Sequence, residues 1–172
     1  MDTLSALTER LLSAATNAGA DSADAIATDG RAVSIEVRDA ALEHAERAEG
    51  IEIGLRVLIG KRQACVSASD TSDATIAEMA DRAVAMARIA PEDSNIGLAD
   101  PGQLALDWDV ASLDLIEDAP EPAPAAMQAA AAEAEAIALG HDGISQVQSA
   151  AASYSRNAIH LAATNGFSGG YE

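Results

Sequence analysis

Hydrophobic and polar residues alternate most regularly in residues 51–69, where two alternating runs flank Gly60 and Lys61. Such alternation is typical of strands that bury one face. The short interruption predicts a β-hairpin with strands at 51–59 and 62–69. The apolar residues of its first strand are Ile51, Ile53, Leu55, Val57 and Ile59.

Three other segments repeat apolar residues every three to four positions, which predicts amphipathic helices over 3–18, 73–90 and 124–139. Gly19 and Gly140 follow the first and third segments, where glycine commonly ends a helix. The stripes expected to face the core are Leu4, Leu7, Leu11, Ala14, Ala15 and Ala18; Ile76, Met79, Ala80, Ala83, Met86, Ala87 and Ala90; and Met127, Ala130, Ala134 and Ile137.

Further alternating runs predict additional strands. The dipeptide Asp29-Gly30 favours a hairpin turn between two of them. One run has the propensity of a helix, but its position between strand patterns favours a strand. The predicted strands cover 23–29, 31–38, 41–48, and a second hairpin of 145–154 and 157–164. The fold class expected is α+β, with a largely antiparallel sheet of meander and hairpins and amphipathic helices packed on it.

Residues 91–119 combine turn residues with short apolar groups, which predicts an ordered connector. We expect Trp108 to anchor it. The other connector residues expected to be buried are Leu104, Leu106, Leu113, Leu115 and Ile116.

Composition narrows the possible partners. Hydrophobic residues make up 49% of the 172 residues and aromatic residues only 2%, so the core must consist of Ala, Leu, Ile and Val. A net charge of −18 argues against binding nucleic acid or anionic membranes and favours a basic partner. A solvated acidic surface explains this charge more simply than a dedicated acidic site.

No apolar run is long enough to span a membrane, and the N-terminus lacks a signal-peptide pattern, so we expect a cytoplasmic protein.

No residue pattern typical of catalysis is present. Cys65, the single cysteine, is expected to be a small packed or half-packed residue of the hairpin. His44 is expected to share a strand face with Glu46 in a surface charge cluster, and His141 and His160 are also interpreted as structural. We therefore predict no catalytic, cofactor-binding or metal-binding residue. The remaining acidic run, expected to be solvated, is Asp107, Asp109, Asp114, Glu117 and Asp118.

Three stretches in this order resemble the TldD/PmbA family, in particular its PmbA (TldE) branch. They are "GIEIGLRVLIGKRQACVSASDTS" (50–72), "GLADPGQLALDWDVASLDLIE" (97–117) and "YSRNAIHLAATNGFSGGYE" (154–172). The resemblance implies that residues 1–164 form an N-terminal α+β domain and that 165–172 begin the connection to a C-terminal domain. Asn165-Gly166 is a turn signal followed by glycines, which also predicts that the natural chain continues past Glu172.

The resemblance also implies a function. The family is known as cytosolic metallopeptidases acting on peptides and unfolded chains, and older names call its members modulators of DNA gyrase. Its TldD branch carries a zinc-binding H-E-x-x-x-H helix, whereas the PmbA branch lacks that helix and pairs with a TldD subunit. The 172 residues contain no such motif. We therefore expect zinc only in a TldD-type partner, and a structural or docking role for this chain in peptide proteolysis.

Two alternatives remain open for the function. The chain could be a stand-alone acidic interaction module, or a modulator of DNA gyrase acting through protein contacts. For the 51–69 hairpin, a free edge could hold an extended peptide by strand addition. The alternative, which we favour slightly, is that residues 50–69 form an internal strand pair with no free edge.

Overall fold

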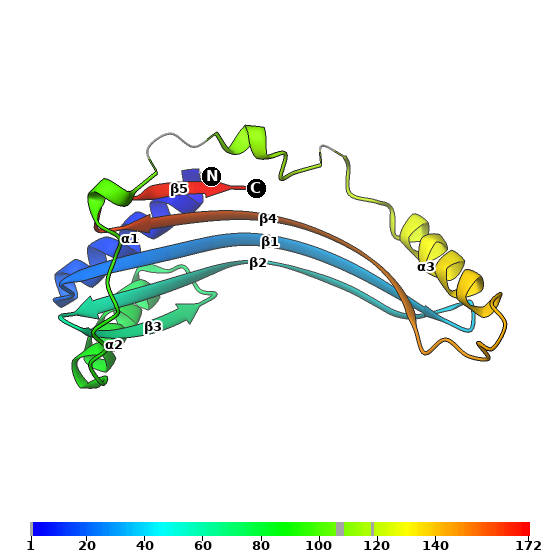
Figure 1. The fold of residues 1–172 in the computed structure, drawn as a ribbon, viewed down its shortest axis with the longest axis horizontal. Coiled ribbons are helices and arrows are strands. Elements are labelled where there is room, and N and C mark those ends of the chain that lie inside the picture. The colour runs from blue at the N-terminus through cyan, green and yellow to red at the C-terminus, as the bar shows by residue number, and fades with distance from the viewer. Residues whose placement is uncertain (1, 106–108, 118) are drawn as a thin grey trace. The chain divides into compact units, whose positions relative to one another are not determined.

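The computed structural model describes residues 2–105, 109–117 and 119–172, and its five strands lie side by side in the order β3-β2-β1-β4-β5 (Figure 1). Helices and strands alternate irregularly along the chain, so the predicted α+β class is confirmed. The elements are α1 (Asp2–Ala18), β1 (Ser22–Arg38), β2 (Ala41–Ile59), β3 (Arg62–Ala68), α2 (Asp73–Ile89), the 3₁₀ turns η1 (Pro101–Gln103) and η2 (Val110–Leu113), α3 (Pro124–Leu139), β4 (Ala150–Ala163) and β5 (Ser168–Tyr171).

Neighbouring strands run antiparallel. The β2–β3 hairpin turns at Gly60, whose φ of 55° lies in the left-handed region, and it pairs Ile53 with Ala68 at its far end. The hairpin predicted at 51–69 is confirmed, and its second strand β3 is the outermost strand of the sheet. At the other edge, the Asn165-Gly166 turn leads into β5, which pairs with the end of β4.

Three long strands were wrongly divided by the sequence patterns. β1 runs unbroken through Asp29-Gly30, and β4 runs unbroken through Ser155-Arg156. The buried residues of β1 keep the same odd numbering on both sides of Gly30, as one continuous strand requires. In β4, Ser155-Arg156 contains no Gly, Pro, Asn or Asp to favour a tight turn, and the strand extends beside β1 instead. β2 is likewise continuous, joining the predicted segments 41–48 and 51–59.

The chain divides into two compact units that share β1, β2 and β4. The first unit comprises residues 1–29, 50–116 and 157–172, and the second comprises 30–49 and 117–156. Each unit has its own apolar core.

In the first unit, α1 and α2 pack against each other and cover one face of the sheet. The predicted stripes of both helices supply most of this core, because amphipathic helices bury their apolar side. Two details differ from expectation: Met86 is exposed, and Val84 is buried in α2. The strand residues in this core are Ala23, Ala25, Ala27, Ile53, Leu55, Val57 and Ala64.

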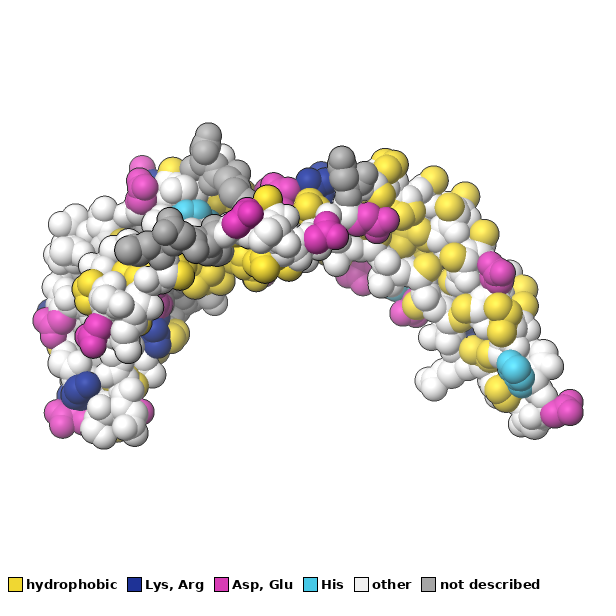
Figure 2. All heavy atoms as spheres, turned by 45° about the horizontal axis from the view of Figure 1, so that its top comes forward, with side chains coloured by type: hydrophobic (Ala, Val, Ile, Leu, Met, Phe, Trp, Pro, Cys, Tyr) yellow, Lys and Arg dark blue, Asp and Glu magenta, His cyan; other side chains and the backbone are white. Residues whose placement is uncertain are grey.

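In the second unit, α3 has the predicted bounds, but its buried face was predicted wrongly. Met127 is buried as expected, whereas Ala130, Ala134 and Ile137 are exposed. Ala131 and Glu135 are buried instead. The Glu135 carboxylate accepts hydrogen bonds from the backbone N–H groups of residues 39 and 40, both at 2.8 Å, and this fixes the rotation of α3. Hydrophobic side chains therefore lie along the outer surface of α3 (Figure 2).

The connector after α2 follows one end of the first unit's sheet. The Asp93 N–H donates to the Lys61 carbonyl in the β2–β3 turn, and the Asn165 side chain in the β4–β5 turn donates to the Ala99 carbonyl. The prediction of burial fails for Leu113, Leu115 and Ile116, which are exposed near this connector's end. The predicted anchor Trp108 and Leu106 lie outside the described residues. No helix in the described ranges is long and apolar enough to cross a membrane.

Candidate functional site

The most distinctive surface of the first unit is the sheet face turned away from α1 and α2. We call it the open sheet face. Residues of even number in β1 and β2 lie there, because their odd-numbered neighbours fill the core under the helices. The face contains a hollow of about 470 Å³ lined by residues of β1, β2, β3 and β4. The lining side chains that matter most are Asp24, Ile26, Arg56, Cys65 and Leu161, around Gly54.

The hollow is apolar at its centre. Ile26 and Leu161 come from the neighbouring strands β1 and β4, and each is 38% exposed. A Cβ atom at Gly54 would lie 2.8 Å from Ile26 Cγ2, so glycine leaves room for the isoleucine side chain there. Exposed aliphatic side chains gathered in a hollow are typical of surfaces that bind a partner or ligand.

One ion pair lies within the hollow. Arg56 Nε donates to Asp24 Oδ2 at 2.9 Å, and Arg56 Nη2 donates to the same oxygen. The hydrogen bonds that Arg56 donates to the Asp24 carboxylate raise the pKa of Arg56. The two charges cancel across β1 and β2, so the floor of the hollow presents a neutral pair rather than a free charge.

Cys65 lies opposite Arg56 in the β2–β3 register. The prediction that it is packed is wrong, because its side chain is exposed on the open sheet face. Side chains alternate along β3, so the strand that packs the buried Ala64 and the partly buried Val66 against the helices turns Cys65 to the other side.

The histidines are placed largely as predicted. The His44 Nε2 and Glu46 Oε2 atoms lie 3.6 Å apart on the surface of the second unit. His160 faces away from Ile159 and Leu161 and is buried. Its Nδ1 lies 2.9 Å from Thr8 Oγ1, and its Nε2 lies 3.4 Å from Ser168 Oγ.

The hydrogen bonds of Thr8 assign the tautomer of His160. Thr8 Oγ1 donates to the Ser5 carbonyl at 2.9 Å, so it must accept from His160 Nδ1–H. Nε2 is then the acceptor for the Ser168 hydroxyl. Burial lowers the pKa of His160, and nearby Glu9 opposes this shift. The contacts join α1 to β4 and β5, which is a structural role.

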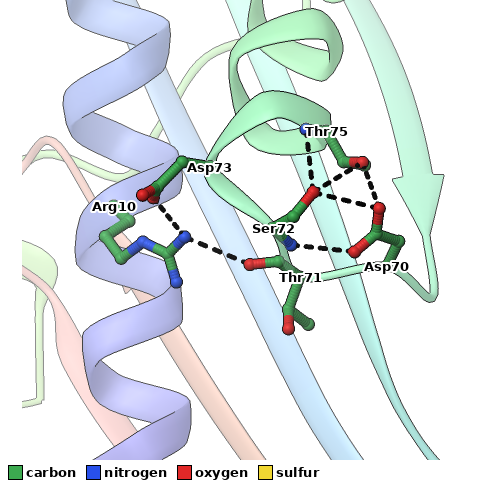
Figure 3. A network of polar contacts seen from close by, with 6 residues as sticks. All are labelled: Arg10, Asp70, Thr71, Ser72, Asp73 and Thr75. Carbon is green, nitrogen blue, oxygen red and sulfur yellow. Dashed lines mark hydrogen bonds and ion pairs between the residues drawn. The ribbon is translucent and has the colours of Figure 1, made fainter.

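A second polar cluster joins α1 to the start of α2 (Figure 3). The Asp70 carboxylate accepts from the backbone N–H of Ser72, the Ser72 hydroxyl and the Thr75 hydroxyl. These bonds, that of Thr75 foremost, lower the pKa of Asp70. Arg10 of α1 donates to the Thr71 carbonyl at 3.1 Å and to Asp73. Each of the six residues drawn in Figure 3 makes at least one contact within the cluster, and this arrangement caps α2.

The acidic run predicted to be solvated is only partly described. Asp109 caps η2 by accepting from the Ala111 N–H, while Asp107 and Asp118 lie outside the described residues. Among the residues that the structure describes, no three His, Cys, Asp or Glu side chains lie together as a metal site would need.

Part of the chain is similar in sequence to a known protein family. A family model described as PmbA/TldA metallopeptidase domain 1 matches residues 23–87. This match supports the predicted resemblance to the TldD/PmbA family over residues 23–87. The match covers β1, β2, β3 and most of α2, which includes most of the open sheet face. Of the three stretches that carried the resemblance, only 50–72 lies within it. No curated protein matches the sequence.

Three solved structures share the fold of this chain. A protein from Bacteroides thetaiotaomicron named as a modulator of DNA gyrase is 18% identical, with a TM-score of 0.74. TldE from Thermococcus kodakarensis is 16% identical, with a TM-score of 0.73, and a second protein named as a gyrase modulator, from Thermotoga maritima, is 11% identical, with a TM-score of 0.66. Each similarity covers 96% of this chain but only 38%, 36% and 36% of the other chains, respectively. The chain therefore spans little more than a third of the length of these proteins.

Proposed function

We propose that this chain is the N-terminal domain of a PmbA/TldE-type subunit in a cytoplasmic metallopeptidase complex. Its role there is to shape the complex and to dock a partner or a peptide, while catalysis and zinc belong to a TldD-type subunit. The observation that carries this proposal is the similarity to TldE, which extends over 96% of this chain and 36% of TldE. The whole fold described here thus corresponds to one part of a longer subunit. The metallopeptidase name of the matching family supplies the reaction class.

The open sheet face supports a docking role. It combines exposed aliphatic side chains with an internally neutralised ion pair, so it offers surface for contact with a partner. The polar clusters of α1 and α2 have their own partners and serve the fold. The domain boundary at residue 164 stays a prediction.

The test is to mix the full-length protein with a TldD-type subunit and to separate the species by size exclusion with light scattering. Zinc content and peptidase activity are then measured for each pool. The proposal predicts activity and zinc in the mixed complex and neither in this protein alone. Zinc-dependent cleavage by this protein alone would contradict the assignment to the non-catalytic branch.

A second candidate is modulation of DNA gyrase, favoured by the names of two of the solved structures. With a net charge of −18, such an effect would pass through protein contacts rather than DNA. A supercoiling assay with purified gyrase tests this candidate. An effect that persists without any binding of this protein to DNA supports it, and direct DNA binding contradicts it.

A further inference from the structure

We propose that the open sheet face binds an extended peptide in which an aliphatic side chain is flanked by basic residues. The inference rests on the proposed docking function and names the surface and the chemistry of its occupant. The aliphatic side chain enters the hollow between Ile26 and Leu161, while the net negative charge of the first unit attracts the basic residues.

The hollow fits an apolar side chain rather than an ion. Its volume of about 470 Å³ falls in the range of small ligand sites, about 300–1,000 Å³. Gly54 removes the side chain that would otherwise displace Ile26 and narrow the space. The Arg56 guanidinium is already bound to Asp24, and its Nη1 lies 3.4 Å from the Gln63 side-chain oxygen. A free carboxylate or ammonium group would therefore have to break this pair, whereas an aliphatic side chain leaves it intact.

The charge of the first unit selects what flanks that side chain. Its sequence contains 17 acidic and 6 basic residues. Such an excess attracts cationic groups over several ångströms and speeds their association. Lysine or arginine beside the aliphatic residue would gain from this field, and acidic residues would be repelled.

The same charge argues against a second copy of this chain as the occupant. Two first units placed face to face would bring together equal negative charges around a patch whose centre holds only a few aliphatic side chains. Like charges brought together at an interface disfavour association. A basic peptide gains both the apolar contact and the electrostatic attraction.

Fluorescence anisotropy with labelled peptides tests the inference on the 172-residue chain. The first peptide has a central leucine flanked by lysines, the second replaces leucine by serine, and the third replaces the lysines by glutamates. The first peptide is expected to bind. The serine peptide should bind at least about tenfold more weakly, since burying a leucine is worth about 1.5–3 kcal/mol. The glutamate peptide should also bind at least about tenfold more weakly, because the negative charge of the first unit repels it. Equal binding of the leucine and serine peptides would show a purely electrostatic contact and overturn the proposal.

Two substitutions in the hollow test whether the peptide binds to the open sheet face. Leu161→Ser and Ile26→Ser are expected to weaken binding of the leucine peptide by about tenfold. Ile89→Ser is the control, because Ile89 is 84% exposed at the end of α2 and lies outside the hollow. Circular dichroism and thermal melting confirm that all three variants fold. If the control weakens binding as much as the others, the inference is wrong.

Light scattering of the same samples tests the competing occupant. Concentration-dependent dimerisation that Leu161→Ser abolishes would show that a second copy covers this face, and would overturn the proposal. Failure of peptide binding while the TldD-type complex still forms would overturn this inference alone. Failure of the complex while peptide binding persists would instead overturn the proposed function.

Discussion

Glu135 offers the most direct test of how the second unit is held together. Its carboxylate is 3% exposed and accepts two hydrogen bonds from the β1–β2 turn, from the N–H groups of Asp39 and Ala40. Both turn residues have positive φ, 51° and 58° respectively, which non-glycine residues adopt at a cost. The two bonds therefore attach α3 to the hairpin and also stabilise an unfavourable turn.

Replacing Glu135 with Gln keeps the size of the side chain but leaves one acceptor oxygen for two donors. A hydrogen bond to a charged group contributes about 1.5–3 kcal/mol, and a neutral one about 1 kcal/mol. The variant loses one charged bond and weakens the other, while water reaches the exposed turn. We expect the free energy of unfolding of the second unit to fall by about 2–3 kcal/mol.

Chemical denaturation followed by circular dichroism measures the loss, and hydrogen exchange of the α3 amides locates it. Glu133→Gln is the matched control, because Glu133 is exposed on the same helix and its substitution should change stability by less than about 0.5 kcal/mol. Equal stability of the Glu135→Gln and Glu133→Gln proteins would refute the role assigned to Glu135.

Four further predictions concern other parts of the chain. Ala40→Gly should stabilise the protein by about 1 kcal/mol in chemical denaturation, because glycine adopts positive φ freely; a loss of stability would contradict the turn geometry. Because burial lowers the pKa of His160, the unfolded state binds the proton more readily. The stability that His160 contributes should then be complete above its ordinary pKa of about 6.5 and be lost as the pH falls below that value. His160→Gln should therefore reduce the dependence of the melting temperature on pH between pH 5.5 and 7.5. Gly170→Ala should accelerate hydrogen exchange in β5, since its Cβ would lie 2.3 Å from the Ile159 carbonyl oxygen, and unchanged exchange would argue against that close pairing. In α3, Met127→Ala should lower the free energy of unfolding by about 2–5 kcal/mol in chemical denaturation, and Ile137→Ser by less than about 0.5 kcal/mol. A larger loss for Ile137→Ser would instead favour the buried face expected from the sequence.

Short sequence patterns correctly located the elements whose structure depends on neighbouring residues. Helical periodicity with Gly19 and Gly140 located α1 and α3, and alternation around Gly60 located the β2–β3 hairpin. These features depend on residues a few positions apart, so a single sequence contains them.

The wrong predictions concern features that depend on contacts between residues far apart in the sequence. Asp29-Gly30 has the chemistry of a turn, but the neighbouring strands hold it extended in β1. The rotation of α3 depends on Glu135 meeting a turn 95 residues earlier in the chain. Propensity and periodicity contain no information on either pairing.

The candidate site was missed for the same reason. Ile26 and Leu161 meet only because β1 and β4 are neighbours in the sheet, and the sequence pattern does not reveal strand order. Gly54 interrupts no alternation and gives no signal of its own. The exposed side of Cys65 was the one local hint, since it lies between Ala64 and Val66 on an alternating strand.

An amide NMR titration of the 172-residue chain with the leucine–lysine peptide shows directly which surface binds the peptide. We predict chemical-shift changes concentrated on the open sheet face, at residues 24–28, 54–56, 65–67 and 159–163. Changes confined to α3 or to the exposed surface of α2, with the open sheet face unaffected, would contradict this prediction.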